Sequence, residues 1–161
     1  MNSGRTQDLR IEAVNFKSEN DEIFNFYPEE ELESSVAFDK PLNFLYEPNA
    51  AILKAGAFRL FANRFNLKKL HPNSHLYTSS ILNSDVPGRR FRIKKFEPFK
   101  GGKQFKGLNK ANISTRNFRI TTEDLRNRLG LKEGGSEFLY FTTDINENPI
   151  VIFTEKADKQ S

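Results

Sequence analysis

The middle of the chain contains the stretch Arg89-Arg-Phe-Arg-Ile-Lys-Lys-Phe-Glu-Pro-Phe99, whose composition is typical of a β-strand. Side chains alternate along a strand, so Phe91 and Ile93 are predicted to lie on one face. The basic residues between them then lie on the other face. The stretch therefore predicts a strand with a basic stripe over an apolar underside.

Positive charge is concentrated around this strand. Residues 89–119 hold eleven basic side chains and one acid, Glu97, although the formal net charge of the 161-residue chain is only +4. Residues 1–50 are the opposite, with eleven acids against four bases. Such a basic segment indicates an electrostatic partner, most often phosphate. The alternatives are a solvated face or an edge strand protected by lysines.

Composition limits the class of protein. A chain of 161 residues with 37% hydrophobic residues and sixteen phenylalanines can bury a core, in one domain or in one domain with a small appendage. The sequence has no cysteine, which excludes disulfides, thiolate metal sites and cysteine nucleophiles. Neither a secretory signal nor a window of membrane-spanning length is recognisable. We therefore expect a cytoplasmic protein without a membrane partner.

The first half of the chain predicts a hairpin and then a helix. Alternating apolar residues in 9–27 indicate a β-hairpin, and the acidic stretch 28–41 is interpreted as a connector that ends at a domain boundary near Pro41. A helix is predicted from an N-cap at Asn49 to about residue 65. Its interior Gly56 suggests close packing against a neighbour.

The second half predicts mainly strands. Short extended segments are expected at 67–70 and 75–78, and a further strand at 111–118. A capping box at Thr121 begins a brief helix that stops at Gly130, and a terminal hairpin follows over 137–155. Because strands and helices interleave without a regular repeat, the fold class is α+β, a mixed sheet with two or three helices preceded by the hairpin.

Five blocks of the chain carry a family resemblance. They are Glu47-Pro-Asn-Ala-Ala-Ile-Leu-Lys-Ala-Gly-Ala-Phe58, Leu67-Lys-Lys-Leu-His-Pro-Asn-Ser-His-Leu-Tyr-Thr78, Pro87-Gly-Arg89, Arg116-Asn-Phe118 and Thr142-Thr-Asp144. In this order they resemble the THUMP-like module at the C-terminus of a bacterial family of class I SAM-dependent methyltransferases. Residues 8–41 are similar to part of the ferredoxin-like segment that precedes the module. The predicted organisation is a partial ferredoxin-like segment and connector at 1–42, a THUMP-like domain at 43–157 and a polar tail at 158–161.

The catalytic domain of that family is not recognisable in this sequence. A Rossmann-type domain needs a glycine-rich turn after its first strand, whereas Gly101-Gly102 and Gly134-Gly135 are isolated pairs typical of polar turns. The Asn-Pro-Pro-Tyr type of element used by many base methyltransferases is also absent. We therefore expect no catalytic residue and no cofactor in this chain, with SAM belonging only to the missing methyltransferase domain.

THUMP domains bind RNA in enzymes that modify tRNA and rRNA, so the resemblance implies RNA binding. The basic residues indicate the same role, because phosphate contacts supply affinity and position. We expect the main contacts from Arg90, Arg92, Lys94 and Lys95. The full predicted set is Arg89, Arg90, Arg92, Lys94, Lys95, Lys100, Lys103, Lys106, Lys110, Arg116 and Arg119.

Other side chains suggest weaker candidates. Phe96, Phe99 and Phe105 lie among the lysines and could stack on unpaired bases, or could be buried in the core. His71 and His75 have the spacing of a helical metal pair, but the Pro72-Asn73 turn between them favours cap or packing roles. No metal ligand is predicted.

Two further hypotheses remain open at this stage. The chain could be a protein-interaction module that docks onto a separate methyltransferase domain, through its hairpin and its acidic N-terminal half. It could also be an intact methyltransferase of unfamiliar design, which saturable SAM binding would reveal.

Overall fold

The computed structural model describes residues 9–157, in which helices and strands interleave as expected for the α+β class. The polar tail predicted at 158–161 lies outside the described residues. The elements are β1 (Ile11–Asn15), β2 (Glu22–Phe26), α2 (Pro28–Glu33), β3 (Phe44–Glu47), α3 (Ala50–Ala55), α4 (Phe58–Phe65), β4 (Lys68–Lys69), β5 (Tyr77–Ser79), β6 (Arg89–Pro98), the 3₁₀ helix η1 (Gly102–Phe105), β7 (Asn112–Thr115), α5 (Thr122–Leu129), β8 (Phe138–Thr143) and β9 (Pro149–Lys156).

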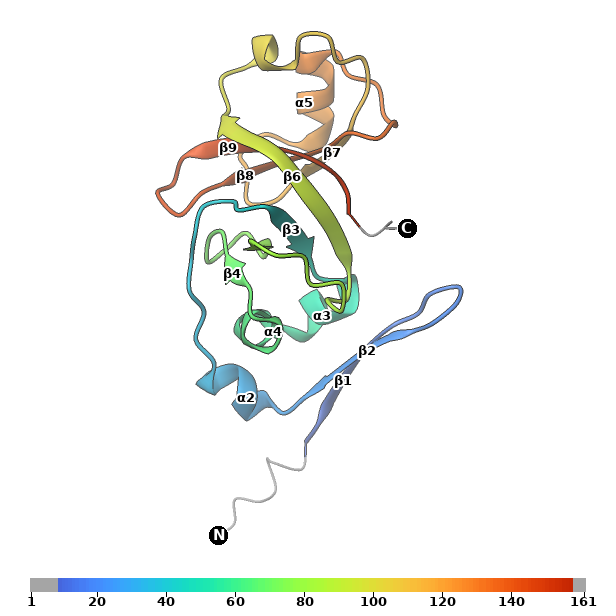
Figure 1. Cartoon of the computed structure of the whole chain (residues 1–161), viewed down its shortest axis with the longest axis vertical. Helices are drawn as coiled ribbons and strands as arrows, with labels where there is room; N and C mark the ends of the chain where they lie inside the picture. The colour runs from blue at the N-terminus through green and yellow to red at the C-terminus, as the bar shows by residue number, and fades with distance from the viewer. Residues whose placement is uncertain (1–8, 158–161) are drawn as a thin grey trace.

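A seven-stranded sheet with the order β4-β5-β3-β6-β9-β8-β7 forms the centre of the molecule. Its neighbouring strands are antiparallel except β7 and β8, which are parallel, so the predicted mixed sheet is confirmed. The first residues of β6 pair with β3, and its remainder pairs with β9. The predicted strand at 89–99 therefore connects the two halves of the sheet (Figure 1).

The predicted N-terminal hairpin is confirmed as β1 and β2, which pair antiparallel in a sheet of their own. A two-stranded hairpin is marginal in water and needs support from a neighbour. The support comes from buried Phe24 and Phe26, whose cluster includes Phe61 of α4 and Ile52 of α3. The hairpin lies at the opposite end of the molecule from α5 (Figure 1).

The single helix predicted from Asn49 is wrong, because the chain forms two short helices, α3 and α4. Asn49 is the N-cap as expected, since its side chain accepts from the backbone N–H of Ile52 at 2.9 Å. Gly56, however, adopts a left-handed conformation with φ 76° and ends α3. A Cβ atom at Gly56 would meet no atom within 4 Å, so the expected close packing there is also wrong.

The acidic connector contains a helix that the sequence analysis missed. Pro28 begins α2, where a missing backbone N–H costs nothing. The carboxylate of Glu31 then accepts from the backbone N–H groups of Arg59 and Leu60, at 3.0 and 2.8 Å. Glu31 thus satisfies backbone donors in the first turn of α4. The described residues contain four α-helices instead of the predicted two or three.

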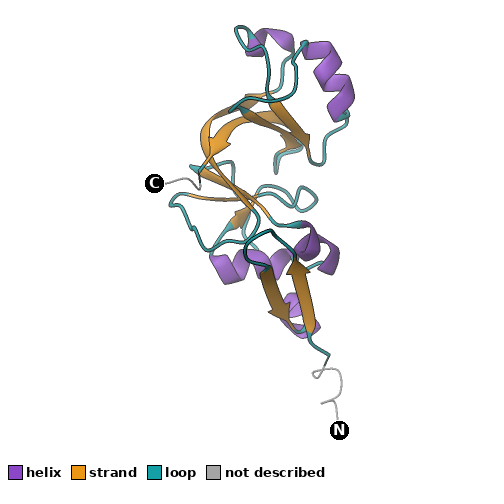
Figure 2. Cartoon of the chain, turned by 90° about the vertical axis from the view of Figure 1, so that its right-hand side faces the viewer, coloured by secondary structure: helices purple, strands orange, loops and turns teal. Residues whose placement is uncertain are grey.

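The two ends of the molecule have separate hydrophobic cores, and helices lie at either end of the seven-stranded sheet, with the β1–β2 hairpin beside the lower helices (Figure 2). At the upper end, residues 99–132 cover one face of the sheet with Phe105, Leu125 and Leu131. The predicted cap at Thr121 is confirmed, since its side chain accepts from Asp124 N at 3.1 Å. The predicted terminal hairpin is confirmed as β8 and β9.

No helix within residues 9–157 is both long enough and apolar enough to cross a membrane.

Candidate nucleic-acid interface

Strand β6 departs from the predicted alternation near its centre. Its register against β9 shifts between Ile93 and Lys95, which places a β-bulge at Lys94. Beyond the bulge Lys95 lies opposite Phe153, with its ammonium 4.6 Å from the centre of that ring. A bulge adds one residue to one strand and shifts the alternation that follows it. The predicted regular stripe is therefore wrong beyond Ile93.

Acidic side chains neutralise the exposed basic residues in the second half of β6. The ion pairs are Arg92–Glu155 at 3.3 Å, Lys95–Glu97 at 3.2 Å and Lys94–Glu137. Such exposed pairs contribute little to stability, typically about 0–1 kcal/mol each. They matter more for binding, because an incoming phosphate must compete with a carboxylate already in place.

Arg90 is a poor candidate for phosphate contact. Its side chain is half-buried, and its Nη1 donates to the backbone oxygen of Val86 at 2.6 Å. Within the described part of the chain its buried Nε has no hydrogen-bond partner. The structure therefore places the Arg90 side chain against the loop that precedes β6 and not on an open basic face.

Arg89 and Arg116 meet at a buried acid. Glu47 is only 5% exposed and accepts from the Tyr140 hydroxyl at 2.6 Å and from the Arg116 guanidinium. Arg89 Nη1 lies 3.7 Å from the same carboxylate. Burial, and then the neighbouring Glu47 carboxylate, raises the pKa of the Tyr140 hydroxyl, which stays protonated and donates. This cluster ties β3 to β6, β7 and β8.

The remaining predicted contacts, Lys100, Lys103, Lys106, Lys110 and Arg119, are exposed, and none has an ion-pair partner within residues 9–157. They lie in the loops and in η1, at the upper end of Figure 1 beside α5. Their ammonium and guanidinium groups are available to a ligand without loss of an existing ion pair.

Two further cations in the same segment were missed from sequence. Arg128 is exposed in the last turn of α5, and Lys132 is exposed where residue 132 bridges to residue 110. Arg128 could have been found from sequence, because basic residues are preferred in the last turn of a helix. We call the following seven residues the basic cap: Lys100, Lys103, Lys106, Lys110, Arg119, Arg128 and Lys132.

Most of the aromatic rings are buried. Phe105 is 5% exposed and stacks on Phe153 with the ring centres 5.6 Å apart. Phe99 is half-buried and meets Phe141 edge-on. Phe96, which is 37% exposed, is the single ring of the three that the structure leaves exposed for a base. Core packing therefore explains the other two.

The two histidines have packing and hydrogen-bonding roles. His71 is buried, and its Nε2 lies 2.8 Å from the carboxylate of Glu147. The His75 ring stacks on Phe58 with the ring centres 3.8 Å apart, and its Nδ1 accepts from Lys69 Nζ at 2.9 Å. Among residues 9–157 no three His, Cys, Asp or Glu side chains are grouped to hold a metal ion.

The buried contact between Lys69 and His75 predicts a pH dependence. Burial, and then the Lys69 ammonium, lowers the pKa of His75 to about 4. The unfolded state then binds more protons than the folded state between pH 4 and 6.5, so stability rises with pH there. The shift corresponds to about 3 kcal/mol, and because His75 is only half-buried we expect acidification across this window to cost about 2 kcal/mol through this residue.

An NMR titration of the imidazole C–H protons checks this directly, because the sequence has only two histidines. The variant His75→Asn assigns the signals, and asparagine also tolerates the left-handed backbone, φ 53°, at this position. Urea unfolding of this variant should show a shallower decline of stability below pH 6.5. A His75 pKa near 6.5 would contradict the prediction.

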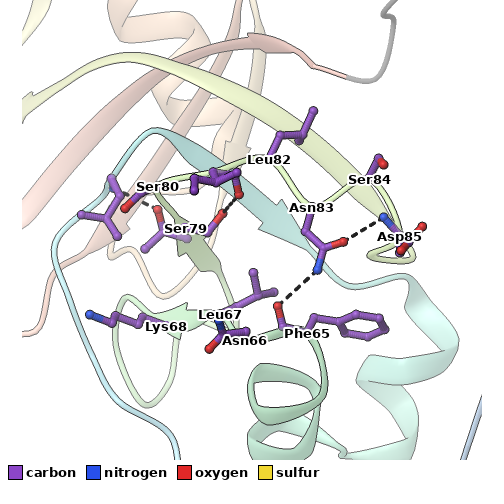
Figure 3. A pocket seen from close by; sticks show the side chains of 13 residues that line it. Phe65, Asn66, Leu67, Lys68, Ser79, Ser80, Leu82, Asn83, Ser84 and Asp85 are labelled. Atoms are coloured by element: carbon purple, nitrogen blue, oxygen red, sulfur yellow. Dashed lines mark hydrogen bonds between the residues drawn. The ribbon is translucent and has the colours of Figure 1, made fainter.

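A cavity of about 580 Å³ lies away from the basic cap, among the loops around β4 and β5 (Figure 3). Its polar side chains serve the local loop structure, since Asn83 Nδ2 donates to Phe65 O at 3.3 Å and Ser79 Oγ donates to Ile81 O at 2.7 Å. Lys68 and Asp85 are its charged members. It has no concentration of positive charge for phosphate.

Comparison with family models identifies two domains in this chain. A ferredoxin-like domain matches residues 44–87, and a THUMP domain-like region matches residues 88–156. The chain thus contains a ferredoxin-like domain followed by a THUMP-like domain, and THUMP domains generally bind RNA. The basic cap belongs entirely to the THUMP-like domain.

Among solved structures, the chain is similar to the crystal structure of a "putative methyltransferase from Porphyromonas gingivalis W83". The two share 38% sequence identity with a TM-score of 0.89, over 94% of this chain and 39% of that one. The chain thus spans well under half the length of that protein. No curated protein matches the sequence significantly.

The matched domains divide the chain differently from the sequence analysis. The models place the junction between Pro87 and Gly88, whereas the sequence analysis put the ferredoxin-like resemblance at 8–41 and the THUMP-like domain from residue 43. At the matched junction the chain passes directly into β6, which pairs with strands of both domains. The two domains therefore share one sheet.

Proposed function

We propose that this chain is the RNA-binding accessory region of an RNA methyltransferase family, and that it captures structured RNA, such as tRNA or rRNA, through the basic cap. The observation that carries the proposal is the set of exposed cations in the THUMP-like domain, none of them ion-paired within residues 9–157. The segment 99–132 has just two acids, Glu123 and Asp124. Glu97 lies near Lys100, and Glu133 follows Lys132, but the cations outnumber these acids, so phosphates meet a surface with net positive charge.

The existing ion pairs indicate which predicted residues contribute most to the affinity for RNA. The cap lysines are expected to contribute most to RNA affinity, because a phosphate can bind them without breaking an existing ion pair. Arg92, Lys94 and Lys95 contribute less, since each already pairs with a carboxylate. Backbone contacts of this kind supply affinity and position more than sequence choice, so the shape of the RNA decides selectivity.

Fluorescence anisotropy with a labelled tRNA and an unstructured RNA of equal length tests this function. We expect the chain to prefer the structured RNA, with an affinity that falls steeply with salt and a log–log slope that corresponds to roughly 4–6 released counterions. An absence of binding at low salt would contradict the proposal.

A second candidate function is docking onto a separate SAM-dependent methyltransferase domain. It is favoured by the exposed apolar side chains of the N-terminal hairpin region, where Phe16 is 82%, Leu9 65% and Ile23 55% exposed. Phe16 directly follows β1 and Ile23 pairs with Val14, so these two lie at the same end of the hairpin, and exposed apolar side chains of this size mark interaction sites. The methyltransferase-like neighbour is also a much longer chain than this one.

Co-purification with a methyltransferase domain expressed as a separate chain tests docking. The variant Phe16→Ser with Ile23→Ser should abolish co-purification and leave RNA binding intact. Equilibrium dialysis with radiolabelled SAM tests the remaining alternative, an intact methyltransferase, which requires saturable binding by this chain alone.

A further inference from the structure

Two adjoining cavities form a groove at the junction of the two domains, separate from the basic cap. One has a volume of about 430 Å³ and the other about 340 Å³. Both are lined by Glu47 and Leu53 of the ferredoxin-like domain and by Arg116 of the THUMP-like domain. We call them together the junction groove.

The first cavity carries positive charge. Arg89, Arg116 and Lys17 line it together with the acids Glu47 and Glu22, and Lys17 pairs with Glu22 at 3.4 Å, which leaves Arg89 as its least compensated cation. Glu47 is buried and holds the Arg116 guanidinium, whose Nη1 also donates to Thr115 O at 2.8 Å. These contacts fix the Arg116 guanidinium in place before any ligand arrives. Because its donors are already occupied, Arg116 adds positive charge to the groove and leaves the direct contact with a phosphate to Arg89.

Arg89 is the more available of the two arginines. Its side chain is 47% exposed, and its nearest carboxylate oxygen, on Glu47, is 3.7 Å away, beyond hydrogen-bond distance. Its guanidinium lies over the rings of Phe91 and Phe138, at 5.2 and 5.6 Å. The rings limit the positions of the guanidinium while its N–H donors remain unused within the described residues.

The second cavity has a different chemistry. Apart from Glu47 and Arg116 its lining is uncharged near neutral pH and consists of Leu53, Phe58, Asn73, Ser74, His75, Thr115 and Asn117. Asn73 and Asn117 are exposed at its edge. Side-chain amides and rings are the groups with which proteins read the edges and faces of unpaired bases.

From this juxtaposition we infer that the junction groove binds one unpaired nucleotide of an RNA strand. The phosphate lies against Arg89, and the base lies against Asn73, His75 and Asn117. This inference rests on the proposed RNA-binding function and adds a single-stranded site to it. Lys110 of the cap and Arg116 are separated by about 20 Å of extended chain, so one RNA can contact both.

Anisotropy titrations with labelled tetra-adenylate and tetrauridylate test the inference. The variant Arg89→Gln is expected to weaken binding of at least one tetranucleotide about tenfold, because a charged hydrogen bond to phosphate is lost. Its matched control is Arg10→Gln, which removes the same charge from an exposed position on the hairpin. The control should change affinity less than about twofold.

NMR supplies a readout of location. The tetranucleotide should shift the imidazole signals of His75, which lines the groove, more than those of buried His71, which contacts the groove only through Asn73 and Asn117. Equal losses in Arg89→Gln and Arg10→Gln, or an unshifted His75, would overturn the inference. If structured RNA still binds through the cap in that case, the proposed function stands while the junction groove is excluded.

Discussion

Neutralisation of three cap lysines together, Lys103→Gln, Lys106→Gln and Lys110→Gln, is expected to lower the affinity for structured RNA about a hundredfold at physiological salt. All three side chains are exposed and have no ion-pair partner within residues 9–157, so each is free to contact phosphate. The variant should also reduce the slope of log affinity against log salt by roughly 2–3. Anisotropy titrations at several salt concentrations measure both quantities.

The matched comparison is neutralisation of three strand residues, Arg92→Gln, Lys94→Gln and Lys95→Gln. Because each of these cations is already paired with a carboxylate, we expect at most about a fivefold loss of affinity. Circular dichroism must show that both variants are folded. A larger loss from the strand variant than from the cap variant would move the RNA site to β6.

The substitution Gly88→Ala is expected to destabilise the protein by roughly 3–5 kcal/mol. Gly88 has φ +110°, and a Cβ atom there would lie 2.2 Å from the backbone oxygen of Glu47 and 2.9 Å from the backbone nitrogen of Asn49. Backbone atoms cannot move aside as a flexible side chain can. The chain before β6 would have to shift. This shift would also weaken the hydrogen bond that the Gly88 backbone N–H donates to the Glu22 carboxylate.

Urea unfolding measures this loss, and Gly102→Ala is the control. No atom lies within 4 Å of a Cβ built at Gly102, and its φ is outside the left-handed region. The control should therefore change the unfolding free energy by less than about 1 kcal/mol. A similarly small change in Gly88→Ala would mean that β3 and β6 do not approach as closely as described.

Local patterns were sufficient to predict several elements. The hairpin at 9–27, the N-cap at Asn49, the cap at Thr121 and the strand at 89–99 all occur as expected. In each case the decisive hydrogen bonds or side-chain alternation depend on residues close together in sequence. Such features can be predicted before any tertiary contact is known.

Other features depended on contacts that the sequence does not display. The apolar spacing of 49–65 matched one helix, but the left-handed Gly56 divided it into α3 and α4, which both pack into the same core with the hairpin. The bulge at Lys94 arises where β6 changes its register on β9. Both departures result from fitting one segment to neighbours that are distant in sequence.

The sequence by itself determined that positive charge is concentrated in residues 89–119 and that an α+β fold carries it. Only the tertiary structure decided which of these charges are available. Glu137 and Glu155 lie far along the chain from Lys94 and Arg92, yet the pairing of β6, β9 and β8 brings them together. The reason is physical, since electrostatic compensation depends on distance in space, and sequence spacing does not report that distance.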